Sequence, residues 1–196
     1  VDKGDADLDR RHIFTGNFVY VTPSLDKWNP IVEQVLGDWQ VNAIISAFSS
    51  TPLDITSGVN TLGTATNPGQ RPNIVSGVPI YLDTGDPTKH LNPAAFSLPA
   101  PGEQGTLSRG TDRGKAINNT DFSVAKNWKV TERYGLQFRT EFFNLFNHPN
   151  FVGFNTGLNF AGNTNNANYG RPTNSAFGTL DATQSHREIQ FGLKFT

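Results

Sequence analysis

Three acidic residues near the start of the chain alternate along it, and carboxylates spaced in this way can hold a calcium ion. Asp5, Asp7 and Asp9 match the first half of a calcium-binding loop, but the glycine and the distal glutamate of that loop do not follow. Residues 110–116 are a near match to a phosphate-binding loop, but the segment is one residue short and lacks the Ser or Thr after its lysine. We interpret both segments as surface loops, with an ion site at the aspartates as the alternative.

The histidines, which are the other candidate metal ligands, lack the spacing of a zinc site. His12, His148 and His186 fall near one rim of the fold expected below and are candidates to meet there; the fourth is His90. The chain has no cysteine, which excludes disulfides, thiol nucleophiles and Cys-ligated metals, and its serines lie in no catalytic motif. We expect a protein that is not an enzyme, with no cofactor and no bound metal.

The composition is typical of strands and long turns. The chain has 196 residues, among them 19 glycines and 12 prolines, a formal net charge of −1 and only 17% charged residues. This charge balance argues against nucleic acid as a partner. No window is apolar and long enough for a membrane-spanning helix, which leaves membrane-spanning strands open. The absence of methionine indicates a processed product or a piece of a longer protein.

Five segments alternate between apolar and polar residues, as β-strands with two different faces do. In the last of them, Ile189 and Phe191 are separated by polar residues. A helix is the competing interpretation of residues 137–147, and a short helical turn is expected at 30–37. The expected strands are residues 12–22, 38–56, 120–130, 135–147 and 187–196.

The connections between these strands alternate in length. Two are shorter, at 23–37 and 131–134, and two are very long, at 58–118 and 148–186. Because every second connection is long, both long loops leave the same edge of a meander, as in outer-membrane barrels. The predicted fold is all-β: residues 1–196 form an antiparallel meander of about five long strands, a partial segment of a transmembrane β-barrel with two long extracellular loops.

The apolar faces of the strands decide between two classes of protein. In a membrane barrel they contact lipid, whereas in a soluble β-sandwich they form a buried core. Strand length and aromatic residues near the strand ends favour the barrel, as at Tyr20, Trp39, Trp128 and Tyr134. The alternative is a soluble sandwich, such as a carbohydrate-binding module. It predicts one closed core made by residues 14, 18, 39, 41, 122, 138, 142, 189 and 191.

The polar faces of the strands carry charges that suit a water-filled lumen. These lumen-facing candidates are Asp121, Arg139, Glu141 and Lys194. Arg139 and Glu141 lie two apart on one strand and share its face. We expect them to pair with a charge on a neighbouring strand, at Asp121 or Lys194. The candidates for ligand contact in the loops are Arg71, Asn73, Asn92 and Phe96, although Arg-Pro and Asn-Pro pairs also form ordinary turns.

Several segments, in order along nearly the whole chain, resemble recurring segments of Oar-like TonB-dependent receptors of the outer membrane, the type with a carboxypeptidase-regulatory-like domain. The most specific are residues 141–151 (EFFNLFNHPNF) and 187–195 (REIQFGLKF). The other segments that carry the resemblance are residues 9–14, 36–41, 50–53, 71–73 and 91–96.

The resemblance implies the C-terminal part of a larger receptor that takes up a ligand through a barrel of about 22 strands. Its plug domain and TonB-contacting segment would lie outside these residues. The implied partners are outer-membrane lipid, an extracellular ligand, the TonB complex and the barrel-assembly machinery. That machinery would read Phe191, Leu193 and Phe195 as the C-terminal signal. Family members commonly end in an aromatic residue, so either one residue is missing after Thr196 or Phe195 is the terminal signal.

Overall fold

A computed structural model describes residues 4–25, 27, 29–63, 70–184 and 186–195. The chain divides into two compact units. The first, which we call the loop unit, comprises Val1–Arg11, Ser49–Lys115 and Phe151–Thr183. The second, the sheet unit, comprises His12–Phe48, Ala116–Asn150 and Gln184–Thr196. Each expected long loop therefore contributes most of its residues to a unit with its own contacts.

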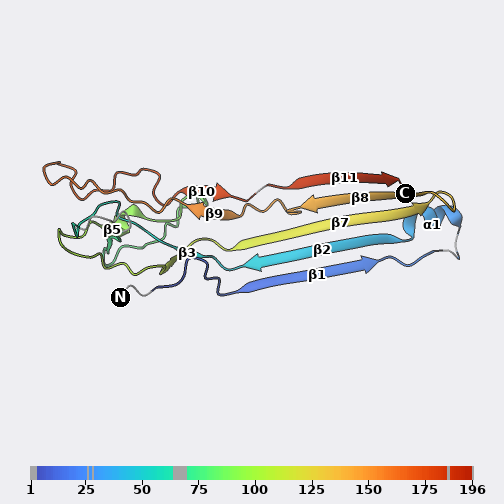
Figure 1. Cartoon of the computed structure of the whole chain (residues 1–196), viewed down its shortest axis with the longest axis horizontal. Coiled ribbons are helices and arrows are strands. Elements are labelled where there is room, and N and C mark those ends of the chain that lie inside the picture. The colour runs from blue at the N-terminus through green and yellow to red at the C-terminus, as the bar shows by residue number, and fades with distance from the viewer. Residues whose placement is uncertain (1–3, 26, 28, 64–69, 185, 196) are drawn as a thin grey trace. The chain divides into compact units, whose positions relative to one another are not determined.

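The sheet unit is one antiparallel sheet with the strand order β1-β2-β7-β8-β11 (Figure 1). Strands that neighbour each other in this sheet also follow each other among the five long strands of the chain, so the predicted all-β meander is confirmed. The strands are longest at the centre of the sheet. Their bounds are β1 Ile13–Val21, β2 Trp39–Phe48, β7 Ile117–Lys129, β8 Gly135–Phe143 and β11 Glu188–Phe195.

The register of the sheet puts apolar residues on one face and polar residues on the other. One row across all five strands is entirely apolar, and its members are Phe18, Ala43, Phe122, Phe142 and Ile189. The neighbouring row faces the opposite side and is polar in all members but the first, and its members are Val19, Asn42, Ser123, Glu141 and Gln190. The pleat thus gives the sheet an apolar face and a polar face, as the alternation predicted.

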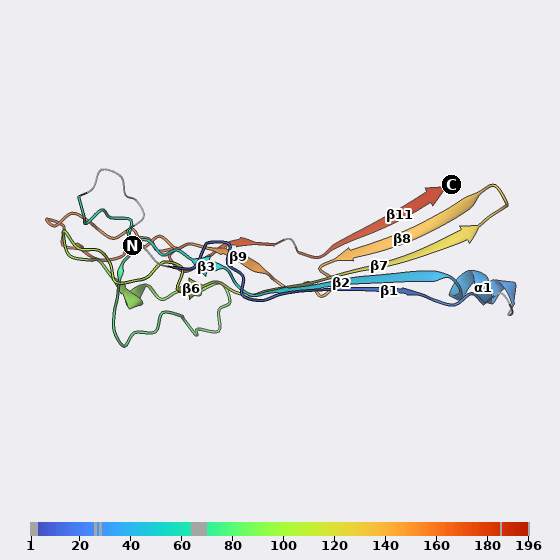
Figure 2. The same cartoon turned by 60° about the horizontal axis from the view of Figure 1, so that its bottom comes forward.

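The apolar face is exposed and forms no closed core. Phe18 is 56% exposed and Phe191 is 74% exposed. The hydrophobic core cluster lies in the loop unit instead, around Ile55, Leu91 and Phe177. Figure 2 shows the five strands as an open, twisted sheet. The soluble-sandwich alternative is therefore wrong, because the residues it needed in a shared interior lie on a bare face.

Two of the expected strands are shorter than predicted. The segment 38–56 breaks after Phe48, and its continuation β3 (Pro52–Leu53) pairs with β6 (Asp112–Arg113) in the loop unit. Strand β8 ends at Phe143 because Asn144 adopts a left-handed backbone conformation, with φ of 51°. The helical alternative for residues 137–147 is likewise wrong, since this segment is strand until Phe143.

A short helix, α1 (Pro30–Leu36), lies in the connection between β1 and β2. Asn29 caps its first turn, with Oδ1 accepting a hydrogen bond from the N–H of Ile31 at 2.9 Å, and the helix ends at Gly37. The helical turn predicted for residues 30–37 is confirmed. None of the described helical segments has the length and hydropathy of a transmembrane helix.

The loop unit is built from short elements around its own core. Leu91, Phe96 and Phe177 are buried there with Leu107, Leu158 and their neighbours. Strand β4 pairs with β5, and β9 pairs with β10, both antiparallel. The bounds of these elements are β4 Asn73–Ile74, η1 Pro93–Ala95, β5 Phe96–Ser97, β9 Phe151–Phe154 and β10 Leu180–Thr183.

Candidate functional site

The polar face of the sheet has a hollow of about 320 Å³. Its polar lining comes from four of the five strands and comprises Asn17, Asn42, Asp121, Ser123, Arg139 and Glu141. A hydrogen bond of 3.1 Å from Asn42 Nδ2 to Ser123 Oγ crosses from β2 to β7. The structure therefore gathers three of the predicted lumen-facing residues in one hollow; the fourth, Lys194, lies on the same face in β11.

Arg139 and Glu141 form an ion pair with each other, with 2.5 Å between Arg139 Nη2 and Glu141 Oε1. The expected pairing with charges on neighbouring strands is wrong. The register explains the difference: the residues opposite Arg139 are Ala125 and Gly192, which carry no charge. The side chain of Arg139 turns along its own strand, where Glu141 shares its face.

Asp121 supports the end of β8. Its Oδ1 accepts hydrogen bonds of 2.9 Å from Asn119 Nδ2 and from the backbone N–H of Asn144. The second bond satisfies the donor of the residue at which β8 ends. Asp121 is thus a structural contact within the sheet unit as well as part of the polar hollow.

The segment 141–151, which carries the resemblance most specifically, forms a corner after β8. Asn144 donates through Nδ2 to the carbonyl of His148 and accepts through Oδ1 from the N–H of His148. Asn147 accepts a hydrogen bond of 3.1 Å from the N–H of Arg187, just before β11. The asparagines of this motif therefore hold the corner together and tie it to the neighbouring strand.

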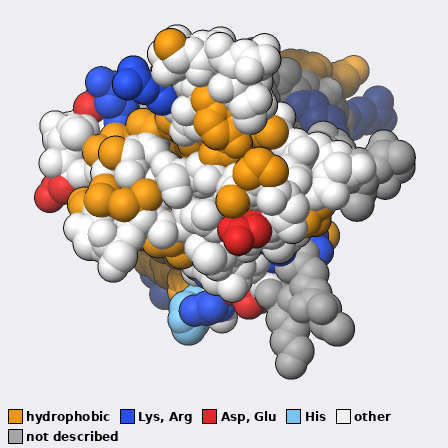
Figure 3. Space-filling model, turned by 90° about the vertical axis from the view of Figure 1, so that its left-hand side faces the viewer, with side chains coloured by type: hydrophobic (Ala, Val, Ile, Leu, Met, Phe, Trp, Pro, Cys, Tyr) orange, Lys and Arg blue, Asp and Glu red, His pale blue; other side chains and the backbone are white. Residues whose placement is uncertain are grey.

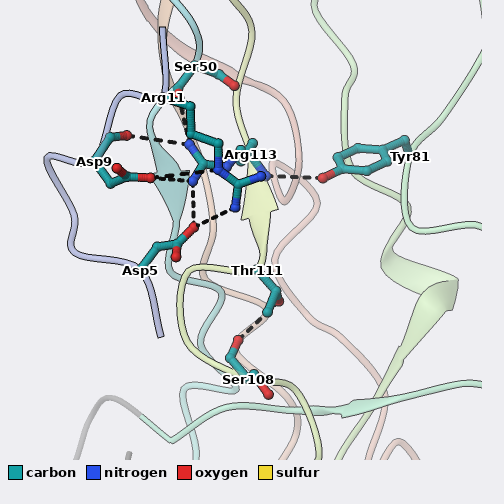
Figure 4. A network of polar contacts seen from close by, with 8 residues as sticks. All are labelled: Asp5, Asp9, Arg11, Ser50, Tyr81, Ser108, Thr111 and Arg113. Carbon is teal, nitrogen blue, oxygen red and sulfur yellow. Dashed lines mark hydrogen bonds and ion pairs between the residues drawn. The ribbon is translucent and has the colours of Figure 1, made fainter. Parts of the chain in front are cut away.

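The acidic residues at the start of the chain face arginines. Asp5 and Asp9 each lie 2.5 Å from Arg113 Nη2, and Arg11 reaches the same Oδ2 atom of Asp5 at 3.1 Å (Figure 4). The exposed Asp7 pairs with Arg109 at 2.9 Å. The carboxylates that an ion would need are thus neutralised by guanidinium groups. Within the described residues, no group of three or more His, Asp or Glu side chains is placed to hold a metal.

Arg113 also adjoins a buried carboxyl group. The backbone N–H of Arg113 donates to Tyr81 Oη at 3.1 Å, and Tyr81 Oη lies 3.4 Å from Asp112 Oδ1. Asp112 is only 5% exposed, and its Oδ2 has no hydrogen-bond partner among the described residues. Burial raises the pKa of the Asp112 carboxyl above its usual value. The ring of His90, one of the candidate ligands, lies at a tilt against Tyr81, with 4.9 Å between the ring centroids, and its Nε2 lies 2.9 Å from the carbonyl oxygen of Arg113.

The four loop residues predicted to contact ligand all take part in the internal structure of the loop unit. Arg71 Nε donates to the carbonyl of Leu107 at 2.9 Å, and Asn73 Oδ1 accepts from the N–H of Thr106. Asn92 caps η1, and the ring of Phe96 lies in the core against Phe177. These contacts give each residue a role in shaping the loops, and ligand contact by them stays a prediction.

A groove of about 430 Å³ opens on the loop unit. It lies between η1 with the following Phe96 and the segment 172–175 with Phe177. None of the described residues that line it is charged; the polar part comes from Thr173, Asn174 and Ser175. In Figure 3 hydrophobic patches lie on the visible face among white groups, with a few acidic and basic side chains between and beside them. The groove suits an uncharged ligand with apolar and hydrogen-bonding parts.

Lys126 is the residue that sequence reasoning missed. It lies on the apolar face of β7, directly opposite Trp39 and Phe138, yet it is only 2% exposed. Its ammonium group lies over the rings of Trp39 and Trp128, 5.4 and 5.8 Å from their centroids. The available signal was a lysine at a position where alternation calls for an apolar residue.

An open antiparallel meander with one exposed apolar face and one polar face that carries a hollow is the structure of the wall of a membrane β-barrel. The sequence agrees, since the model of the family described as outer membrane beta barrel domain matches residues 1–190. The chain belongs to this family, and its location is the bacterial outer membrane. No curated protein and no solved structure gives a significant match.

Proposed function

We propose that the chain is the C-terminal barrel portion of a TonB-dependent receptor of the Oar-like type, which captures an extracellular ligand and takes it up across the outer membrane. The observation that carries the proposal is a loop unit with its own hydrophobic core and groove in a chain that also forms barrel wall. A plain pore needs no such folded loops. The resemblance of residues 141–151 and 187–195 to these receptors adds to it.

In this proposal the chain is not an enzyme. Its partners are outer-membrane lipid on the apolar face, a plug domain and the TonB complex in the intact receptor, and the barrel-assembly machinery, which reads Phe191, Leu193 and Phe195. Nucleic acid has no part in it. The hollow with the Arg139–Glu141 pair supports a contact surface for plug or solute, since its polar groups suit a wet lumen.

Conductance separates a plugged receptor from an open pore. The intact protein is purified from outer membranes and inserted into planar lipid bilayers. A receptor closed by a plug carries almost no current until urea loosens the plug, and it closes again when the urea is removed. A steady conductance without urea, unchanged by its addition, contradicts the proposal.

The groove supplies a second test, aimed at the capture of ligand. Replacement of Thr173 or Ser175 by Lys puts a charge into an uncharged groove. Uptake is measured with a panel of neutral solutes. For any solute that the intact protein imports, uptake should be lost in these variants and retained in the control variant Ser108→Lys, which lies outside the groove. Import that depends on neither the groove nor the proton-motive force contradicts the proposal.

A further inference from the structure

The carboxyl end of α1 is capped by side chains from the sheet. The indole Nε1 of Trp39 donates to the carbonyl of Val35 at 2.8 Å, and the indole Nε1 of Trp128 donates to the carbonyl of Gln34 at 2.9 Å. Lys126 Nζ donates to the carbonyls of Glu33 and Gly37. The last carbonyls of a helix lack partners within it and carry partial negative charge. A lysine and two indoles supply the hydrogen-bond donors and the positive charge that stabilise such an end.

All three capping residues lie on the apolar face of the sheet. Trp39 pairs with Lys126 across β2 and β7, and Trp128 pairs with Leu136 across β7 and β8. The helix therefore covers the outer surface of the wall rather than the polar hollow. In Figures 1 and 2 α1 lies at the edge of the sheet where one short connection links β1 to β2 and the other links β7 to β8. In outer-membrane barrels the short turns are on the periplasmic side.

The contact explains why a lysine is tolerated on a face that meets lipid. Its ammonium group is enclosed by two carbonyls and two indole rings and does not meet hydrocarbon. Removing a charge from water is costly unless it is hydrogen-bonded, and here the lysine is 2% exposed and bonds to both carbonyls. Lys126 thus fixes the helix against the wall.

The exposed side of α1 is mostly apolar, with Gln34 as its polar residue. Ile31 is 72% exposed and Val35 is 56% exposed, and the two lie one turn apart on the same side of the helix. Leu36 is exposed beside them. The acidic residue of the helix, Glu33, is on the sheltered side and is half-buried. This surface continues the apolar face of the wall around the Trp39 and Trp128 rings.

We propose that α1 is an in-plane membrane anchor, which inserts Ile31, Val35 and Leu36 among the phospholipids of the periplasmic leaflet while Lys126, Trp39 and Trp128 hold it on the barrel wall. The occupant is lipid because the exposed side of α1 is continuous with the face that an outer-membrane barrel turns to the bilayer. Indole rings favour the interface between lipid and water, because the ring is apolar and its N–H is polar.

The chain has no cysteine, and any cysteine elsewhere in the intact protein is first replaced by serine, so that a single introduced cysteine reports on one site. A fluorophore is attached to Val35→Cys in the intact protein, in isolated outer membranes. The control carries Arg133→Cys, an exposed position in the other short turn. The label at position 35 should be quenched several-fold more by a nitroxide dissolved in the lipid and several-fold less by aqueous iodide than the label at 133. Equal iodide quenching at both positions overturns the proposal, and so does shielding from both quenchers, which indicates a protein partner.

A second pair of variants tests the role of Lys126. In Lys126→Met the helix loses the cation that caps it, and iodide quenching at position 35 should rise toward the value at 133. Lys126→Arg keeps the charge and should leave quenching near that of the parent. If Lys126→Met fails to assemble, Trp128→Phe removes the indole N–H that bonds to Gln34 and leaves a smaller phenyl ring, and it should cause a smaller rise. An unchanged label environment in the assembled variants overturns the assignment of Lys126.

Discussion

The side-chain amide of Asn150 forms hydrogen bonds with both backbone groups of Asn118, accepting from its N–H and donating to its carbonyl at 2.8 Å each. Asn150 therefore takes the place of a neighbouring strand at the start of β7, where β8 no longer pairs with it because β8 ends at Phe143. This one residue of the segment 141–151 extends the sheet without a strand, which gives a physical reason for an asparagine at that position.

Asn150→Ala should destabilise the folded sheet by about 1–3 kcal/mol, because it removes two hydrogen bonds between the buried Asn150 side chain and the backbone of Asn118. The control is Asn17→Ala, since Asn17 is exposed on the polar face. Urea unfolding in detergent, followed by the gel mobility of unheated samples, measures the difference. Equal midpoints for the two variants would show that the Asn150 contact contributes nothing.

Arg113 ties the start of the chain to the rest of the loop unit through Asp5 and Asp9. In Arg113→Met both carboxylates lose their main partner, and amide hydrogens of residues 4–9 should exchange at least several-fold faster. Arg109→Met removes only the exposed contact with Asp7 and serves as the control. Hydrogen exchange read by mass spectrometry tests this, and unaltered exchange in Arg113→Met would refute the tether.

The same tether depends on pH. The hydrogen bond from Arg113 holds the pKa of the Asp5 carboxyl below its ordinary value of 3.8. A lowered pKa in the folded state means that the contact stabilises fully above that ordinary value and is lost as pH falls through the lowered pKa. The protection of residues 4–9, which is the intrinsic exchange rate at each pH divided by the observed rate, should therefore be constant between about pH 5 and 8 and should fall only in stronger acid.

Asp112→Asn should stabilise the loop unit at neutral pH. Burial raises the pKa of Asp112, so the folded state becomes less favourable as pH rises from 3.8 through that raised pKa. Asparagine keeps the acceptor that faces Tyr81 and removes the buried charge. Thermal unfolding at neutral pH should shift upward, whereas the variant and parent should agree in acid. A lower midpoint at neutral pH would mean that the charge is needed.

The two faces of β11 should respond differently to a new charge. Phe191→Arg places a guanidinium on the apolar face and should cost about 2–4 kcal/mol, if the site lies near the middle of the bilayer. Gln190→Arg points to the polar face, opposite Glu141, and should be close to neutral. The fraction of folded protein in the outer membrane measures both. Equal assembly of the two variants is the contrary result.

The strands were predictable because their side chains alternate, and alternation is local. Where strands end was not, because the left-handed turn at Asn144 depends on Asp121 of the neighbouring strand. The Arg139–Glu141 pair needed the register, which shows that uncharged residues lie opposite Arg139. Contacts between segments far apart in sequence set both the strand ends and the surroundings of this pair.

The candidate sites divide in the same way. Sequence reasoning placed the candidate lumen-facing charges on one shared face, because a face follows from the period of two, and their contact with a lumen stays a prediction. It did not find Lys126, whose partners on α1 are about ninety residues away in the chain. The C-terminal residues Phe191, Leu193 and Phe195 are exposed on the apolar face, and their reading by assembly machinery stays a prediction; Thr196 lies outside the described residues.

The orientation of the sheet is tested most directly by spin labels on single cysteines in the intact protein in outer membranes. Labels replace outward residues Phe122, Phe138 and Phe191 and inward residues Ser123, Gln137 and Gln190. Oxygen, which dissolves in the bilayer, should relax the outward labels, and a water-soluble nickel chelate should relax the inward ones, alternating from one residue to the next. A reversed pattern, or equal accessibility on both faces, would contradict the account.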